Sequence, residues 1–287
     1  MSGNENIHPV ATGLARRTAD EHSAEQPLKL IAGWFCPFVQ RTWVTLEEKG
    51  IPYQYVELTR FLKSEQPPPG TPRGIVPGLE VAPGKNLYDS TILGEYLEDQ
   101  YPNHLPRMLP PAGTDTNYER ARARIWRDFV TSRVVPAFHW LLQFQPKAFE
   151  EKRGEEEGSG EKRLDELRVE FRNQLLELTR EMSYGGPYFN GAEFGMVDIA
   201  LLPWALRLWV FDVFKGGLRI PEPGQGGQDE GTWARWRQWL DAVKNRDSVK
   251  KTMSDREYYI PVYKRYADDT VQNELAKSIR SGKPLLP

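Results

Sequence analysis

The sequence predicts an α/β domain followed by an all-helical domain. Residues 28–101 carry patterns in the order strand, helix, strand, loop, hairpin and helix. Residues 102–116, PNHLPRMLPPAGTDT, contain four prolines and no apolar periodicity, which predicts an interdomain linker. Residues 117–287 carry helical patterns almost throughout. A chain of 287 residues is long enough to form two hydrophobic cores, so the length agrees with this division.

Local signals justify each element of the first domain. The apolar run LKLIAG at 28–33 predicts a short buried strand. The helix at 37–49 has proline at its first position and Gly50 after its last. The other predicted elements are an alternating strand at 53–58, a hairpin at 75–89 around the turn APGKN, and a helix at 90–100 with Ser90 as its N-cap.

The second domain is predicted to consist of long helices with one irregular insert. A helix at 117–145 is expected to bend at Pro136, which cannot donate a backbone hydrogen bond. Residues 150–162, EEKRGEEEGSGEK, are rich in charge and glycine and are expected to be mobile. The other predicted helices are 162–183, the apolar core helix 196–212, the amphipathic helix 232–245 and a C-terminal tail at 258–279.

Composition and charge exclude several classes of protein. With 38 Lys plus Arg against 40 Asp plus Glu, interleaved along the chain, no nucleic-acid partner is indicated. No window reaches the roughly 20 apolar residues of a membrane span. Residues 1–27 mix acids with arginines, unlike a secretory or mitochondrial signal, and are expected to form a flexible extension. A single cysteine cannot form an internal disulfide, which favours a reducing, cytoplasmic location.

The one cysteine, Cys36, lies in GWFCPFVQRT at the predicted start of a helix. Free backbone N–H groups and the helix dipole at this position stabilise an anion and lower a thiol pKa. Arg41, about one turn later, can add positive potential. The alternative is that Cys36 is a small buried apolar residue, which is common for a free cysteine. Position alone leaves both interpretations open.

Three segments, taken in order and spacing, carry a family resemblance: FCPFVQRTWVTLEEKGIPYQYVEL, GIVPGLE and LYDSTILGEYLEDQYP. Together they resemble the glutathione transferases, and the Cys-Pro-Phe centre resembles their omega class. The resemblance extends from about Leu28 to about Tyr266. It implies a thioredoxin-like first domain that binds glutathione as co-substrate without a metal, and a helical second domain with a second-substrate pocket. It also implies a homodimer.

The resemblance assigns roles to particular residues. Cys36 would be catalytic, Val76 would offer its backbone to glutathione beside a cis Pro77, and Asp89 with Ser90 would hold the γ-glutamyl end. The complete set of implied glutathione contacts is Phe35, Pro37, Phe38, Lys63, Val76, Pro77, Asp89 and Ser90. The implied second-substrate pocket contains Trp204, Arg207 and Tyr258, although Trp204 equally fits a core position. Asp198 matches a buried helix-capping aspartate whose role is structural.

These features predict a thioltransferase or reductase. The Cys36 thiolate would attack a glutathione mixed disulfide or the sulfur of a glutathionyl adduct. Position 39 is valine, so a second thiol of the CxxC type is absent and a second glutathione must release the product. The implied reactions are deglutathionylation, dehydroascorbate reduction and removal of glutathione from aromatic ketone adducts, on a small electrophilic or disulfide substrate.

Two alternatives remain at this point. The first is a non-catalytic protein that binds glutathione or another ligand on the same fold. The second is a conjugating transferase that uses a serine or tyrosine hydroxyl. Trp34 and Phe35, which precede Cys36, offer no hydroxyl, so the second alternative ranks last.

Overall fold

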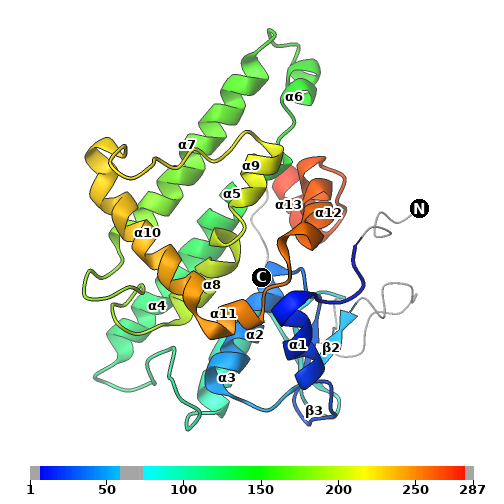
Figure 1. The fold of residues 1–287 in the computed structure, drawn as a ribbon, viewed down its shortest axis with the longest axis vertical. Helices are drawn as coiled ribbons and strands as arrows, with labels where there is room; N and C mark the ends of the chain where they lie inside the picture. The colour runs from blue at the N-terminus through cyan, green and yellow to red at the C-terminus, as the bar shows by residue number, and fades with distance from the viewer. Residues whose placement is uncertain (1–6, 59–70, 72–73, 282–287) are drawn as a thin grey trace.

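The computed structural model describes residues 7–58, 71 and 74–281, and its N-terminal half is built on a four-stranded sheet (Figure 1). The strand order is β2-β1-β3-β4. β1 pairs in parallel with β2, and β3 pairs antiparallel with both β1 and β4. The strands are β1 Lys29–Ala32, β2 Gln54–Glu57, β3 Gly78–Ala82 and β4 Lys85–Tyr88. The predicted strands and hairpin are confirmed.

Two helices follow strands of this sheet and pack against each other. They are α2 Pro37–Lys49 and α3 Ser90–Gln100. α2 connects the parallel strands β1 and β2, because parallel neighbours need a crossover. Gly50 ends α2 in the left-handed conformation, with φ of 57°, as expected for a C-terminal glycine. This arrangement is the predicted thioredoxin-like layer.

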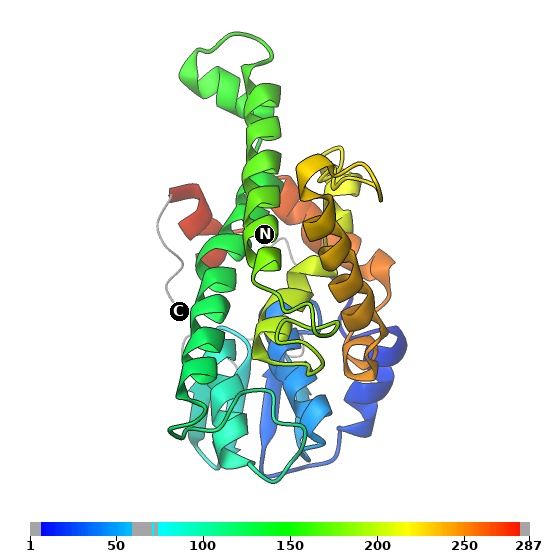
Figure 2. The same ribbon diagram turned by 90° about the vertical axis from the view of Figure 1, so that its left-hand side faces the viewer.

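The C-terminal half is helical and lies above the sheet domain in Figure 2. Residues 101–116 join the two halves without a helix or strand. The elements are α4 Asn117–Phe129, the π-helical turn η2 Val130–Val134, α5 Val135–Gln143, α6 Pro146–Arg153, α7 Ser159–Arg180, α8 Met196–Ala205, α9 Trp209–Phe214, the 3-10 turn η3 Gly227–Asp229, α10 Glu230–Asn245, α11 Asp247–Lys251, α12 Arg256–Ala267 and α13 Glu274–Ser281. The predicted two-part fold class is confirmed.

The N-terminal segment is not a flexible extension where the structure describes it. Residues 13–21 form α1 Gly13–Glu21, which packs against α11. The Thr12 N–H donates to Ser254 Oγ at 3.0 Å, and Thr12 Oγ1 accepts from the Asp255 N–H at 2.9 Å. The expectation failed because its polar composition hides apolar anchors, Ala11 and Ala15, which are almost completely buried.

The charged insert at 150–162 is also more regular than expected. Its first part lies in α6, and α7 already begins at Ser159. The Glu150 carboxylate accepts from the N–H groups of Gly158 and Gly160, both at 2.9 Å, which closes the turn between the helices. Gly160 is required there, because a Cβ would lie 2.4 Å from the carbonyl oxygen of Pro146. The insert is therefore a turn between two helices, closed by these hydrogen bonds.

Two predicted long helices are interrupted. The bend expected at Pro136 is the π-helical turn η2, which ends just before this proline and accommodates its missing N–H. The core helix is split into α8 and α9 after Ala205. At the break, the Arg207 N–H donates to Trp204, three residues back, and the Pro203 carbonyl accepts from the Arg207 side chain instead.

Within the part of the chain that the structure describes, no helix has the length and hydrophobicity needed to cross a lipid bilayer.

Candidate functional site

Cys36 lies where helix α2 begins. It is the N-cap residue, and Pro37 occupies the first turn, as the sequence predicted. The four consecutive residues from Phe35 to Phe38 are half-buried, whereas the residues on both sides of them are buried. The junction of strand β1 and helix α2 is therefore partly accessible to solvent at four residues, and Cys36 is one of them.

The electrostatic environment of Cys36 differs from the prediction. Burial raises the pKa of the Cys36 thiol, while the backbone N–H groups of Val39 and Phe38 and the charges of Arg207 and Arg41 oppose this rise. The helix terminus thus acts in the expected direction, but desolvation is the larger effect. The prediction of a lowered thiol pKa is wrong for this state of the protein.

The loop before β3 runs beside the cysteine. The Val76–Pro77 peptide bond is cis, as predicted. The Cys36 Sγ lies 3.9 Å from the carbonyl oxygen of Val76, a distance at which a thiol donates a weak hydrogen bond. Val76 is half-buried and Pro77 is buried. The fold therefore brings two predicted site segments, 40 residues apart in sequence, into contact.

The start of α3 places Asp89 and Ser90. Asp89, and not Ser90, is the N-cap: its Oδ1 accepts from the N–H groups of Thr91 at 2.7 Å and Ile92 at 3.3 Å. The sequence did not show this because Asp89 adopts a φ of 73°, which is rare for a residue with a Cβ. Ser90 is then the first helical residue, and its Oγ lies 3.4 Å from Arg41 Nη1. Predicted Lys63 lies outside the described residues.

The predicted second-substrate residues occupy two different environments. Trp204 and Arg207 are each 1% exposed and lie in the interface between α2 and α8. Trp204 packs edge-on against Phe38 at 5.0 Å, which agrees with the core interpretation. The indole N–H of Trp204 and the Nε and Nη2 of Arg207 have no hydrogen-bond partner among the described residues. Tyr258 on α12 is half-buried and contacts the His8 ring at 4.7 Å.

Sequence reasoning missed a row of tyrosines on α12. Tyr259, Tyr263 and Tyr266 are spaced by four and three residues, so they lie on one helix face, and their rings contact in succession. Burial raises the pKa of Tyr263 well above its ordinary value and that of Tyr266 to about 12, and Cys36 contributes to both increases. The tyrosine spacing in YYIPVYKRY was the available signal.

The loop before Cys36 is also attached to the N-terminal segment. The Trp34 indole N–H donates to the His8 carbonyl at 2.8 Å. Trp34 in turn packs against Tyr259 at 5.0 Å. The N-terminal segment, the loop before Cys36 and α12 are therefore one packed unit, which the sequence did not reveal because these contacts join distant segments.

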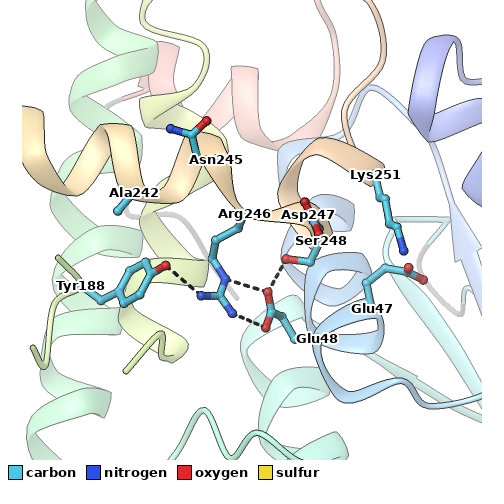
Figure 3. A pocket seen from close by; sticks show the side chains of 9 residues that line it. All are labelled: Glu47, Glu48, Tyr188, Ala242, Asn245, Arg246, Asp247, Ser248 and Lys251. Atoms are coloured by element: carbon cyan, nitrogen blue, oxygen red, sulfur yellow. Dashed lines mark hydrogen bonds and ion pairs between the residues drawn. The ribbon is translucent and has the colours of Figure 1, made fainter. Parts of the chain in front are cut away.

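A polar surface pocket of about 580 Å³ lies between α2 and the α10–α11 corner (Figure 3). In it, Arg246 donates to both carboxylate oxygens of Glu48 at 2.8 and 2.5 Å and to the Tyr188 hydroxyl at 2.8 Å. Ser248 also donates to Glu48. Among the described residues, its lining includes neither Cys36 nor a predicted glutathione contact, so this pocket marks a junction between the two halves.

Comparisons with known proteins agree with this geometry. The family model described as "Glutathione S-transferase, N-terminal domain" matches residues 35–100. The model described as "Glutathione S-transferase, C-terminal domain" matches residues 161–242. Together these matches cover more than half of the chain, and the first begins one residue before Cys36.

Individual relatives have names that include the omega class. The chain is 34% identical to glutathione S-transferase omega-1 of Sus scrofa over 174 residues, which is 61% of this chain and 64% of that protein. It is 30% identical to glutathione S-transferase U17 of Arabidopsis thaliana over 236 residues, 81% of this chain and 92% of that protein.

The solved structures include one relative with higher identity. Glutathione transferase Omega 3C from Trametes versicolor is 38% identical, with a TM-score of 0.71, over 90% of this chain and 97% of that chain. Both halves of the fold, the residues around Cys36 and these similarities lead to one conclusion. The chain belongs to the glutathione S-transferase family and is similar to its omega class.

Proposed function

We propose that the protein is a glutathione-dependent thioltransferase that reacts through a Cys36–glutathione mixed disulfide. The observation that carries this proposal is the placement of the chain's one sulfur nucleophile at the start of α2, half-buried and beside the Val76–Pro77 loop. A serine or tyrosine hydroxyl in this place would activate glutathione, whereas a cysteine can itself attack sulfur.

The reaction balances in two exchanges. In the first, the Cys36 thiolate attacks the glutathione sulfur of a mixed disulfide; the Cys36–glutathione bond forms and the substrate leaves as a thiolate. In the second, the thiolate of another glutathione attacks this bond, which releases oxidised glutathione and restores the Cys36 thiolate. The substrate is released as a thiol, and its glutathionyl group and the one added glutathione leave together as oxidised glutathione. In the first step with an aromatic ketone adduct, the leaving group is the ketone's enolate, which then takes a proton.

The surrounding residues support a bound tripeptide. The backbone of Val76 can pair with the cysteinyl part, in the manner of an added strand, and the half-buried Phe35, Pro37 and Phe38 can line this part of the site. The Ser90 hydroxyl suits a γ-glutamyl carboxylate, and the Asp89 carboxylate suits its ammonium group. We also propose Lys63 as a glutathione contact.

The second substrate is proposed to bind beside Tyr258, with Trp204 and Arg207 behind the inner wall of its pocket. The unpartnered indole N–H of Trp204 suits an oxygen acceptor. We propose a carbonyl or disulfide compound, which includes dehydroascorbate and aromatic ketone adducts. A cytoplasmic location, where glutathione is kept reduced, fits this chemistry.

The test is substitution of the nucleophile. Cys36→Ala should lower the reduction of a glutathione mixed disulfide more than about a thousandfold, because no other thiol exists in the chain. Cys36→Ser is the matched variant: it should lose reduction to the same extent while gaining weak conjugation of glutathione to an electrophile. Reduction retained by Cys36→Ala would refute the proposal.

The competing function is a non-catalytic glutathione-binding protein. The raised pKa of the Cys36 thiol is the observation that favours this alternative. It predicts that wild-type protein binds glutathione in calorimetry yet shows no turnover of mixed disulfides. Turnover that depends on Cys36 would exclude it.

We also propose a homodimer formed through the face around β4, α3 and α4. This face carries a pocket of about 640 Å³ lined by Tyr88, Ile92 and Thr131 among others. Tyr88 and Ile92 are 37% and 54% exposed, and Ile125 on α4 is 64% exposed, which is high for apolar side chains on a free surface. Sedimentation equilibrium should give twice the chain mass, and Ile92→Glu should weaken association. A monomer at micromolar concentration would contradict the proposal.

A further inference from the structure

Two buried arginines lie in the interface between α2 and α8. Arg41 is 3% exposed and Arg207 is 1% exposed. Across residues 7–58, 71 and 74–281, Arg41 Nη2 and both Nε and Nη2 of Arg207 lack a hydrogen-bond partner. In the described part of the chain, neither guanidinium has a carboxylate within salt-bridge distance. A buried cation without a counter-ion is costly, so this interface is arranged for a negative charge.

Neutral groups hold Arg41 in place. Its Nε donates to the Ala200 carbonyl on α8 at 3.0 Å, and its Nη1 lies 3.4 Å from Ser90 Oγ. Its guanidinium carbon lies 4.6 Å from the centre of the Trp204 ring, a cation–π contact. Burial lowers the pKa of Arg41 to about 9, so the side chain stays charged at neutral pH. These contacts fix its orientation but leave its charge uncompensated.

Arg207 is held from the opposite helix. Its Nη1 donates to Gln40 Oε1 on α2 at 2.6 Å and to the Pro203 carbonyl at 2.7 Å. Its guanidinium carbon lies 4.8 Å from the centre of the Tyr259 ring. Gln40 and Arg41 are neighbours on α2, so the packing of α2 on α8 brings both cations to the helix that Cys36 caps.

The ionisable groups around these arginines are few. Cys36 interacts electrostatically with both, and Arg127 and Asp89 with Arg41. Arg127 on α4 is a further cation, but it is paired with Glu95 at 3.0 Å. Asp89 is already engaged by two backbone N–H groups at the start of α3. Tyr263 and Tyr266 also face Cys36 from α12, but their raised pKa keeps them uncharged at neutral pH. Gln40, which holds Arg207, lies one turn after Cys36, and its N–H donates to the Cys36 carbonyl at 3.1 Å. Both arginines are thus attached to the first turns of α2, and Cys36 is the titratable residue at the start of that helix.

We propose that Arg41 and Arg207 are the counter-ions of the Cys36 thiolate. This inference rests on the proposed function and deepens it, because the thiolate occurs twice in the cycle. It is the attacking group in the first exchange and the leaving group in the second. Positive charge that stabilises it aids its formation and its release from the mixed disulfide. Both arginines are positioning residues, since they act through Cys36.

The experiment measures the pH profile of Cys36 alkylation by iodoacetamide in the absence of glutathione. Because Cys36 is the one cysteine of the chain, the reaction reports this thiol alone. Arg41→Met and Arg207→Met should each move the midpoint upward by about one pH unit, and the double variant should move it further. Below the midpoint this corresponds to about a tenfold lower rate per variant. Arg41→Lys and Arg207→Lys should keep most of the wild-type rate.

A buried arginine elsewhere provides the matched control. Arg168 is also 3% exposed, but it bonds to the carbonyls of Gly217 and Lys215 and to Asp165. Arg168→Met should leave the midpoint unchanged. Where a Met variant does not fold, Arg41→Gln or Arg207→Gln removes the charge while keeping a polar group. Near-ultraviolet circular dichroism verifies folding.

Unchanged midpoints in folded charge-removing variants would overturn the inference, as would Lys variants that shift as far as the Met variants. This outcome is distinct from failure of the proposed function. If the wild-type protein reduces mixed disulfides and the variants show no shift of the midpoint, only the counter-ion proposal is refuted. If the variants show the shift and the wild-type protein reduces no mixed disulfide, only the proposed thioltransferase function is refuted.

Discussion

At the scale of single residues, the proposed chemistry depends on two opposing effects on the pKa of the Cys36 thiol. Its place as the N-cap of α2 supplies N–H groups that favour the thiolate, while its surroundings remove water that the thiolate needs. Desolvation is the larger effect in the protein without bound glutathione. The neutral thiol is therefore favoured in this state, and a thiol reacts less readily than a thiolate.

The balance of these two effects predicts how the alkylation of Cys36 depends on pH. Because the pKa of the Cys36 thiol is raised in the folded protein, its alkylation midpoint should lie above that of the same protein unfolded in urea. The folded chain holds the thiol proton more tightly, so this group's contribution to stability is lost as the pH rises from the unfolded pKa through the folded one. Iodoacetamide rates at a series of pH values, with and without urea, check this. A lower midpoint in the folded state would contradict it.

At this scale the sequence predicted the position of Cys36 but not its environment. The helix start and Pro37 predicted the N-cap position of Cys36 correctly, since these are local signals. The direction of its pKa shift could not be predicted, because burial depends on contacts with segments distant in sequence, such as the loop at Val76. The N-cap at Asp89 was missed for another reason: it depends on a backbone conformation with positive φ.

At the scale of elements, one buried carboxylate holds the start of α8 against its neighbours. Asp198 accepts from the Gly195 N–H at its own helix start, from the Phe189 N–H and from the Trp239 indole on α10, at 2.7 to 2.8 Å. Gly195 provides no side-chain oxygen, so only one half of a capping box is present. The structural role predicted for Asp198 is thus visible in its contacts, and it extends to α10.

Removal of this carboxylate should be severe. Asp198→Ala leaves three buried N–H groups without an acceptor, and we expect a loss of about 3 kcal/mol or more in the free energy of unfolding. Asp198→Asn keeps one oxygen acceptor and should lose less. Urea unfolding followed by tryptophan fluorescence measures both. Equal stability of Asp198→Ala and wild type would contradict the assignment.

Asp198 should also make the free energy of unfolding depend on pH in the acid range. Burial raises the pKa of Asp198 to about 6, so the folded protein holds this proton more tightly than the unfolded chain does. The stabilisation from protonation is complete below about pH 4 and is lost as the pH rises through 6. Asp198→Asn should remove this slope from a plot of unfolding free energy against pH. A slope that persists in this variant would exclude Asp198 as its source.

The helices and strands themselves were predictable where the signal is local. Strand alternation, Gly50 and the hairpin turn gave the thioredoxin-like half correctly. The break between α8 and α9 was not predictable from hydrophobicity, because both sides of it are apolar and the break depends on the Arg207 side chain bonding to Pro203. The helical part of the insert was not predicted, because its charge and glycine content resemble a loop, while Glu150 bonds to N–H groups at the start of the next helix.

At the scale of the whole molecule, a polar clamp and the N-terminal segment join the two halves. The Arg246–Glu48 pair, visible in Figure 3, connects α2 to the α10–α11 corner with two charge-assisted hydrogen bonds. Arg246 also lies over the Phe194 ring at 4.2 Å. The contacts of Thr12 and Trp34 attach the N-terminal segment to both halves.

The clamp should show measurable coupling. A double-mutant cycle with Glu48→Ala and Arg246→Ala should give an interaction energy of about 1.5 kcal/mol or more in urea unfolding, because the pair is bidentate and largely shielded from water. Lys264 and Asp268 form a matched exposed pair, with side chains 60% and 47% exposed. Their cycle should give less than about 0.5 kcal/mol. Similar energies for the two pairs would contradict the clamp.

The central claim concerns one covalent bond, so the most direct measurement is the intact mass of the protein after incubation with oxidised glutathione. We predict that the wild-type chain gains one glutathionyl group, that reduced glutathione removes it, and that Cys36→Ala gains none. A wild-type chain that keeps its original mass, under conditions where glutathione binding is shown by calorimetry, would contradict the account.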